Sequence, residues 1–388
     1  MEPLCVSTWI APLQPGLGER EIDELRVLET HLVQALTTGP LTGAGLLTLR
    51  RRLAAFRQPD ATPDLAPPAL ALTDSLAAFL CGFYDLDLRD TVGVGHGRMI
   101  LRHAGEPVRR HWAGRLAAGD LVGIAATERH GGSRLQEITT QATIRPGGGW
   151  LLTGEKCWVS RLTEASGFVV FFKDPAGALS AAVLDADTPG LQRQPVTPSG
   201  LGGWAWGVLS LTDVPLHPQD LLGGPGEGLC VFRRHFAHFR PLVAATALGT
   251  AAGAHTAVTT DLTARLDTRL IRRLRDNALV TLGRTHAELN AALLHAIGAA
   301  ALTAAGSPHS DIWSRGAKAH AVDTAHRATA ELSLLVGASA YQAHSPLAKA
   351  RTDLGGLLYA DGIHDALQRS VGRTLTTHPA AQPYSQAS

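Results

Sequence analysis

Apolar residues recur at helical spacing along the first part of the chain. Steps of three and four positions place side chains on one face of an α-helix. A second apolar run, Ala69–Phe83, follows a proline-rich stretch at 58–68 that predicts a loop. We therefore expect residues 1–121 to form a helical domain. The recurring positions are Ile22, Leu25, Leu28, Leu32 and Leu36.

The pattern changes at residue 122. Short apolar runs then alternate with glycine, proline and aspartate as far as Val214. Many short strands divided by turn residues are typical of a β-barrel or sandwich. Residues 122–227 are accordingly predicted to form a central β-domain. The clearest predicted strands are Trp150–Gly154, Gly167–Phe172, Ala181–Leu184 and Val208–Leu211.

Long, alanine-rich, periodic segments return after residue 228. Four helices of this length predict an antiparallel four-helix bundle over residues 228–375. The polar segment 376–388 contains proline and is expected to be a disordered tail. The predicted fold class is therefore α+β, with helical, β and helical-bundle domains in that order. The expected bundle helices are Leu242–Leu266, Asp276–Ala305, Asp311–Gln342 and Leu354–Leu375.

Charge and cysteine content exclude several classes of partner and site. The 388 residues carry a formal net charge of +1, which argues against nucleic acid or an anionic membrane surface as the main partner. The four cysteines are scattered, so neither a metal site nor a disulfide framework is indicated. The N-terminus lacks a secretory pattern and no apolar stretch approaches ~20 residues, so we expect a cytoplasmic protein without a membrane span.

Several short segments resemble motifs of the acyl-CoA dehydrogenase family, in the family's order. Thr127-Glu128 followed by Gly131-Gly132-Ser133 is similar to T-E-P-x-x-G-S-D, and residues 154–160, Gly-Glu-Lys-Cys-Trp-Val-Ser, resemble G-x-K-x-W-I-[ST]. Further matches lie at 221–228 and 240–249. The resemblance covers roughly residues 80–375. It implies the three domains described above, with FAD between the β-domain and the bundle.

The resemblance also implies which residues contact FAD. Trp158 would pack against the flavin ring and Ser160 would hydrogen-bond near flavin N5, the atom that accepts hydride. Taken singly, Trp158 is as well explained as a core aromatic and Ser160 as a strand-end hydroxyl. Other implied contacts are Ile124, Ala126, Thr127, Gly132 and Ser133, with Arg265 and Gly337 on segments that bind pyrophosphate across a subunit contact.

A carboxylate stands where the family places its catalytic base. The family removes the α-proton of an acyl thioester with a glutamate of a y-E-G-T segment, and Asp361 occupies that position here. Aspartate is shorter by roughly 1.5 Å, so the substrate or backbone must lie closer, or the substrate class differs. An Asp-Gly turn or a helix N-cap would also explain Asp361. His235 and His238, three positions apart, are an alternative source of a base.

Several FAD-binding positions of the family are altered in this chain. Thr268 and Arg269 replace Phe-Gly after Arg265, and the glycine-rich segment keeps only Gly337. These losses fall on the side of FAD that a neighbouring subunit supplies. An arginine-dense run at 265–275, a mixed oligomer, or loss of flavin would each explain them. The segment Trp204-Ala205-Trp206 replaces small polar residues, either narrowing the substrate cavity or filling the core.

The sequence therefore predicts an FAD-dependent α,β-dehydrogenation of an acyl thioester, carried by CoA or an acyl-carrier protein, in specialised metabolism. The resemblance implies a homodimer or homotetramer, and the sequence does not indicate the electron acceptor. Two alternatives stay open. One is a flavin oxidase or monooxygenase on the same fold, and the other is a flavin-free or non-catalytic subunit of a mixed oligomer.

Overall fold

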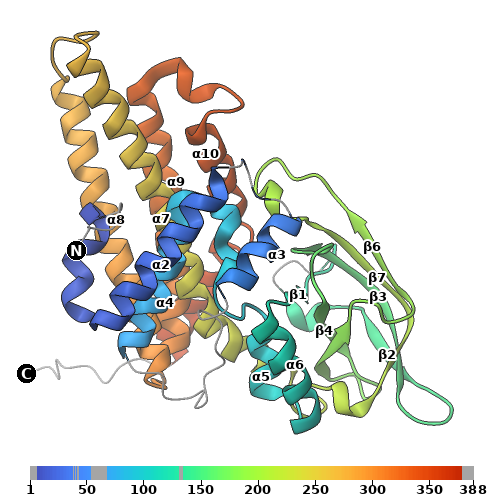
Figure 1. Cartoon of the computed structure of the whole chain (residues 1–388). Coiled ribbons are helices and arrows are strands. Elements are labelled where there is room, and N and C mark those ends of the chain that lie inside the picture. Colours follow the sequence, from blue (N-terminus) through green and yellow to red (C-terminus); the bar gives the residue numbers. More distant parts are fainter. Residues whose placement is uncertain are drawn as a thin grey trace, which may run out of the picture.

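A computed structural model describes residues 7–37, 39, 41, 43–53, 68–130 and 134–377. Figure 1 shows the first N-terminal helices packed against a long helical bundle, whereas the last two, within residues 97–118, lie beside the sheet. The expected order of helical, β and helical domains is confirmed. The prolines of the expected loop lie mostly at 54–67, outside the described residues, and helix α4 begins at Pro68.

The N-terminal helices form as their apolar spacing predicts. Leu25, Leu28 and Leu32 of α2 are fully buried, while the opposite face of the helix is charged. Helix α4 is buried along most of its length because it packs against both α2 and the long bundle helix α7. The helices are α1 (Ser7–Ile10), α2 (Glu19–Leu36), α3 (Gly43–Arg52), α4 (Pro68–Tyr84), α5 (Gly97–His103) and α6 (Glu106–Ala118), with the 3-10 helix η3 (Leu86–Thr91) between α4 and α5.

Within its described residues, the β-domain forms one seven-stranded sheet. Its strand order is β1-β4-β2-β3-β7-β6, and β5 pairs with β4 on a side branch. All four strands expected from the sequence are present. The sequence pattern did not predict three further strands, β1, β2 and β6. All three are short, and β2 and β6 are also largely exposed, so they lack a clear apolar run. The strands are β1 (Val122–Ala125), β2 (Gln141–Ile144), β3 (Trp150–Val159), β4 (Gly167–Lys173), β5 (Leu179–Asp185), β6 (Leu191–Pro195) and β7 (Gly207–Leu216).

The bundle differs from the sequence prediction at its C-terminal end. The prediction of a single helix at 354–375 is wrong, because the chain turns between α10 and α11. Asp361 lies in this turn with a backbone φ of 58°, which is not helical. Helix α9 ends before Gly337, whose φ of 78° and ψ of −153° are not helical. Helix α11 extends through Thr377, so the tail predicted from residue 376 begins later, and residues 378–388 lie outside the described part. The bundle helices are α7 (Gly228–Asp267), α8 (Asp276–Ala304), α9 (Ser310–Val336), α10 (Pro346–Leu357) and α11 (His364–Thr377).

Helices α4 and α7 approach so closely that only glycine fits at their crossing. A Cβ at Gly82 would lie 1.9 Å from the Thr246 carbonyl oxygen, and one at Gly249 would lie 2.0 Å from the Phe79 carbonyl oxygen. This contact ties the N-terminal domain to the bundle. By length and composition alone, helices α7 and α8 are apolar enough to cross a membrane. The most apolar 18-residue stretch of α7 is 67% buried inside the protein, and that of α8 is 33% buried.

Candidate functional site

A buried ion pair joins the two motif segments of the β-domain. The Glu128 carboxylate accepts hydrogen bonds from Lys156 Nζ at 2.8 Å and from the backbone and hydroxyl groups of Thr139 and Thr140. Burial would raise the pKa of Glu128, but the bonds from Lys156 and Thr140 lower it to about 2. The ion pair therefore fixes Thr127 and Trp158, which lie close to Glu128 and Lys156 along the chain, relative to each other. The sequence motifs contained both residues, but nothing in the sequence alone marked them as a pair.

The predicted flavin contacts of the β-domain lie on adjacent segments. The Cys157 N–H donates to the Thr127 carbonyl at 2.8 Å, which places Thr127 beside β3. Trp158, on β3, has a φ of 59° and leaves 58% of its surface exposed. Ser160 is half-buried immediately after β3, while Gly132 and Ser133 lie outside the described residues. Of the remaining predicted contacts, Ile124 is half-buried on β1 and Ala126 is buried just after it.

Arg265 and Gly337 meet at the opposite end of the bundle. Arg265 Nη2 donates to the Val336 carbonyl at 3.2 Å, directly before Gly337, and Arg265 also pairs with Asp261 at 2.8 Å. Figure 1 shows this end, where α7 turns into α8, far from the sheet. Within one chain the two groups of predicted FAD contacts are therefore not brought together.

Asp361 lies in the turn between α10 and α11. Two buried cations hold the carbonyl groups of this turn: Lys318 Nζ donates to Leu357 and Gly362, each at 2.7 Å, and Arg240 Nε donates to Asp361 at 3.2 Å. Burial lowers the pKa of Lys318 to about 7. An aspartate adopts a positive φ more readily than most residues, and these three bonds hold it there.

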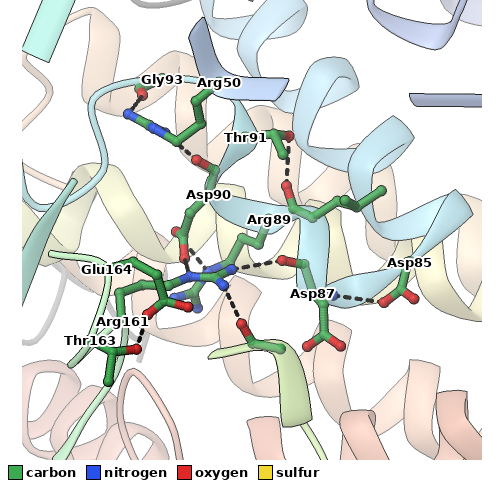
Figure 2. A network of polar contacts seen from close by, with 12 residues as sticks. Arg50, Asp85, Asp87, Arg89, Asp90, Thr91, Gly93, Arg161, Thr163 and Glu164 are labelled. Carbon is green, nitrogen blue, oxygen red and sulfur yellow. Dashed lines mark hydrogen bonds and ion pairs between the residues drawn. The ribbon is translucent and has the colours of Figure 1, made fainter. Parts of the chain in front are cut away.

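The Asp361 carboxylate is not free, because Arg89 from the N-terminal domain pairs with it. Arg89 Nη1 lies 2.7 Å from Asp361 Oδ2, and the two side chains are only 6% and 9% exposed. Arg89 Nε also lies 3.4 Å from Asp90 Oδ1, and Asp90 Oδ2 accepts from Arg161 Nε at 2.8 Å. Figure 2 shows Arg161, Asp90 and Arg89 converging in this network. We call Arg161, Asp90, Arg89 and Asp361 the ion chain.

The ion chain connects all three domains. Arg89 and Asp90 belong to η3, Asp361 belongs to the bundle, and Arg161 directly follows Ser160 of the β-domain. Burial would raise the pKa of Asp90, but the charges of Arg89 and Arg161 hold it well below its usual range. The ion chain thus connects the edge of the β-domain that is predicted to contact flavin with Asp361, the predicted base. The sequence analysis missed Arg89, Asp90 and Arg161, and the one signal was the dense charge of η3 directly after the apolar helix α4.

Aromatic rings and two histidines surround Arg89. Its guanidinium carbon lies 3.8 Å from the centre of the Trp204 ring and 5.3 Å from that of Phe239. His96 Nδ1 and His235 Nε2 are 2.9 Å apart. Burial lowers the pKa of His96 to about 4 and lowers that of His235 as well, so both are neutral at pH 7. We call Arg89, Trp204, Trp206, His235 and Phe239 the Arg89 cluster.

Three carboxylates near the ion chain share one lysine. Asp85, Asp87 and Asp353 lie close enough to hold a metal ion, but Lys349 Nζ is 2.6 to 2.9 Å from an oxygen of each. The ammonium group therefore takes the central position. Through these ion pairs Lys349 joins α10 to Asp85 and Asp87 of the N-terminal domain.

Comparison with known proteins identifies the family. Residues 123–214 match the model of the acyl-CoA dehydrogenase middle domain, and residues 226–376 match that of the acyl-CoA dehydrogenase C-terminal domain. Cyclohex-1-ene-1-carbonyl-CoA dehydrogenase of Geobacter metallireducens is 26% identical over 301 residues, which are 72% of this chain and 75% of that protein.

Solved structures share the complete fold. Butyryl-CoA dehydrogenase from Megasphaera elsdenii superposes with a TM-score of 0.81 at 20% identity, over 93% of this chain and 99% of that one. The prolyl acyl carrier protein oxidase AnaB superposes with a TM-score of 0.77 at 18% identity, over 92% of this chain and 99% of that one. The two family models together span well over half of the sequence and meet at the boundary between sheet and bundle. The chain therefore belongs to the acyl-CoA dehydrogenase family.

Proposed function

We propose that this protein is an FAD-dependent oxidoreductase that removes hydrogen from the α and β carbons of an acyl thioester. One observation carries the proposal: the ion chain connects the Asp361 carboxylate to Arg161, the residue after Ser160. A buried carboxylate and the edge of the β-domain thus converge where the three domains meet. Such convergence suits a reaction in which a proton and a hydride leave neighbouring carbons.

The β-domain edge fits a flavin ring. Trp158 exposes 58% of its surface on a strand whose other large residues are mostly covered, and a planar ring would cover the indole face. The half-buried Ser160 and Thr127 provide hydroxyl groups beside it. FAD bound there supplies the hydride acceptor. The residues proposed to hold it are Ile124, Ala126, Thr127, Gly132, Ser133, Trp158 and Ser160.

Asp361 is the proposed acceptor of the α-proton. Its carboxylate must first give up its contact with Arg89 and turn towards the α-carbon of the substrate. A base must lie within hydrogen-bond reach of the proton that it takes. Arg240 and Lys318 keep the backbone of the turn in place while the side chain changes partner. Trp204 and Phe239 flank the guanidinium of Arg89, which pairs with this carboxylate.

The thioester is proposed to be carried by CoA or an acyl-carrier protein, in the cytoplasm. Relatives named for CoA thioesters and a structural neighbour named for a carrier protein both support this class. A homodimer or homotetramer is proposed because the end of the bundle where α7 turns into α8, which carries Arg265, lies far from the sheet of its own chain (Figure 1). Exposed Leu279, Val280 and Leu294 give α8 an apolar surface for such a contact.

The test of the reaction is anaerobic bleaching of the oxidised flavin by an acyl thioester. Asp361→Asn keeps the shape of the side chain but removes the base, so bleaching should slow by at least about a hundredfold. Asp365→Asn, on the exposed face of α11 just beyond the turn, is the matched control and should bleach at the rate of the unaltered protein. If the flavin of the Asp361→Asn variant bleached as fast as that of the unaltered protein, Asp361 would not be the base.

One observation favours the flavin-free alternative. The Arg89–Asp361 pair already satisfies the carboxylate, as it would in a purely structural contact. The two interpretations differ in the absorbance expected of the purified protein. Flavin bands that persist through gentle purification support the enzyme, whereas a colourless protein that takes up no added FAD supports the alternative.

A further inference from the structure

The end of β3 that leads to Ser160 has an unusual backbone conformation. Trp158 and Arg161 have φ angles of 59° and 56°, in the left-handed region that residues with a Cβ atom seldom adopt. The register between β3 and β7 also shifts between Lys156 and Val159, which indicates a β-bulge. Bulges bend a strand and redirect its side chains, and they are common beside functional sites. The chain is therefore bent on both sides of Ser160.

The side chain of Arg161 anchors this bend to two other segments. Nε donates to Asp90 Oδ2 at 2.8 Å, and Nη2 donates to the Asp87 carbonyl at 2.7 Å, both in η3 of the N-terminal domain. Nη1 donates to the carbonyl of Gly203, in the 3-10 helix η5 (Gly202–Trp204). Figure 2 shows Arg161 extending towards Asp90 and Asp87. All three nitrogens of the guanidinium are thus bonded, and only 4% of the side chain is exposed.

The backbone of the bend is also confined. The Arg161 N–H donates to the Trp204 carbonyl at 2.5 Å. A Cβ atom at Gly123 of β1 would lie 3.3 Å from the Ser160 carbonyl oxygen, so β1 passes directly beside Ser160. A left-handed φ outside glycine persists only where the surrounding contacts impose it. Loss of the anchor would therefore let Arg161 return to a commoner conformation, and this change would turn the Ser160 hydroxyl.

We infer that Arg161 is a positioning residue, which holds the Ser160 hydroxyl against the flavin from an anchor in the N-terminal domain. The inference rests on the proposed function, in which Ser160 hydrogen-bonds near flavin N5. The guanidinium is directed to η3 and η5, so Arg161 acts on the flavin through Ser160. A displacement of about 1 Å near the reacting atoms slows a reaction by about a hundredfold. The anchor therefore contributes to the rate of the reaction and not to the affinity for substrate.

Hydrogen exchange on the full-length, FAD-loaded protein tests the anchor. Arg161→Met removes the guanidinium bonds, so the amide groups of residues 157–162 should exchange at least about tenfold faster than in the unaltered protein. Residues 167–173 of β4, which pair with β1 and β5, should keep their exchange rates. Arg145→Met, at an exposed position directly after β2, is the matched control and should change neither segment. Unchanged exchange at 157–162 in Arg161→Met would overturn the inference.

Flavin bleaching in a double-variant cycle tests the route through Ser160. The limiting anaerobic rate is measured with the acyl-CoA thioester that bleaches the unaltered protein fastest, chosen from straight-chain, branched and aromatic examples. Ser160→Ala and Arg161→Met should each slow bleaching at least about tenfold. The double variant should match Ser160→Ala within about twofold, because both changes remove the same contact. The half-saturating thioester concentration should change by less than about twofold. Losses that multiply in the double variant would show that Arg161 does not act through Ser160.

Arg161→Lys tests whether the geometry of the anchor matters beyond its charge. Lysine keeps a cation beside Asp90 but lacks the planar fork that reaches three acceptors. Exchange and bleaching should therefore both fall between the values for Arg161→Met and for the unaltered protein. Complete restoration of both properties by lysine would overturn the three-bonded anchor. This variant also replaces Arg161→Met in both measurements if Arg161→Met does not fold.

The readouts separate this inference from the proposed reaction. If no thioester bleaches the unaltered FAD-loaded protein, dehydrogenation is wrong. The same cycle is then measured as FAD dissociation constants, where losses that multiply again overturn the inference. If the unaltered protein is bleached and Arg161→Met is bleached at the same rate, dehydrogenation stands and the inference fails.

Discussion

At the scale of single residues, the site depends on charged groups that the sequence placed far apart. Arg89 and Asp361 are 272 positions apart, and Arg161 and Asp90 are 71 apart. Motif resemblance indicated Asp361 and Trp158, because the family keeps a carboxylate and an aromatic residue at those positions. No local pattern could indicate Arg89 or Arg161, since an arginine becomes part of a site only when the fold brings its partner to it.

The Arg89–Asp361 pair should contribute measurably to stability. Arg89→Met leaves Asp361 without its buried partner and should lower the free energy of unfolding by about 3 kcal/mol. Adding Asp361→Asn should cost less than the sum of the two single changes, because the pair is already broken. Urea unfolding measures all three variants. Arg20→Met, which breaks an exposed pair on α2, is the control and should change stability by less than about 1 kcal/mol. Strict additivity would show that Arg89 and Asp361 do not interact.

The Glu128–Lys156 pair predicts acid sensitivity. The pKa of Glu128 is lowered to about 2 in the folded protein, from the ordinary glutamate value of 4.5. Between these two pKa values the folded state therefore binds fewer protons than the unfolded state. The contribution of the Glu128 carboxylate to stability is complete above about pH 4.5 and is lost as the pH falls towards 2. Glu128→Gln should lower stability at pH 7 and flatten the pH dependence in that window, as measured by urea unfolding at a series of pH values. An unchanged acid profile would contradict this assignment.

At the scale of elements, the turn between α10 and α11 determines where Asp361, the proposed base, lies. Sequence periodicity predicted one helix from 354 to 375, because apolar residues recur on both sides of the break. The turn forms instead because Lys318 and Arg240, from α9 and α7, bond to its carbonyl groups. A single-chain pattern does not contain these donors. By contrast, α2 and β4 follow their own patterns closely and were predicted well.

Glycine at position 362 should be required by this turn. Gly362 has a φ of 117°, and a Cβ there would lie 2.9 Å from Leu367 Cδ2. Gly362→Ala should cost at least about 1 kcal/mol in unfolding free energy and slow flavin bleaching, because the strain moves Asp361. Gly372→Ala, inside α11 where nothing lies within 4 Å, should be neutral or stabilising by up to about 1 kcal/mol. If both changes were equally tolerated, the turn would not constrain the base.

At the scale of the whole molecule, the domain order and the family could be predicted from the sequence, while the meeting of three domains at Arg89 could not. The α4–α7 crossing and the ion chain fix the N-terminal domain, the sheet and the bundle against one another. In Figure 1 the end of the bundle where α7 turns into α8 lies far from the sheet, so under the proposed function Arg265 would contact the FAD of a neighbouring subunit.

An oligomer should therefore be needed for tight FAD binding. The unaltered protein should sediment as a dimer or tetramer, and Leu279→Glu with Leu294→Glu on α8 should reduce the sedimenting mass and weaken FAD retention together. Val27→Glu, at an equally exposed position on α2, should change neither property. A monomer that retained FAD would contradict this assembly.

The most direct measurement of the central claim is the visible spectrum of the gently purified full-length protein, recorded before and after anaerobic addition of an acyl thioester. The account predicts flavin bands in the first spectrum and their loss in the second, as hydride passes to the bound FAD. A protein that shows no flavin bands and acquires none after incubation with FAD, or whose bands persist with every thioester tried, would contradict the account.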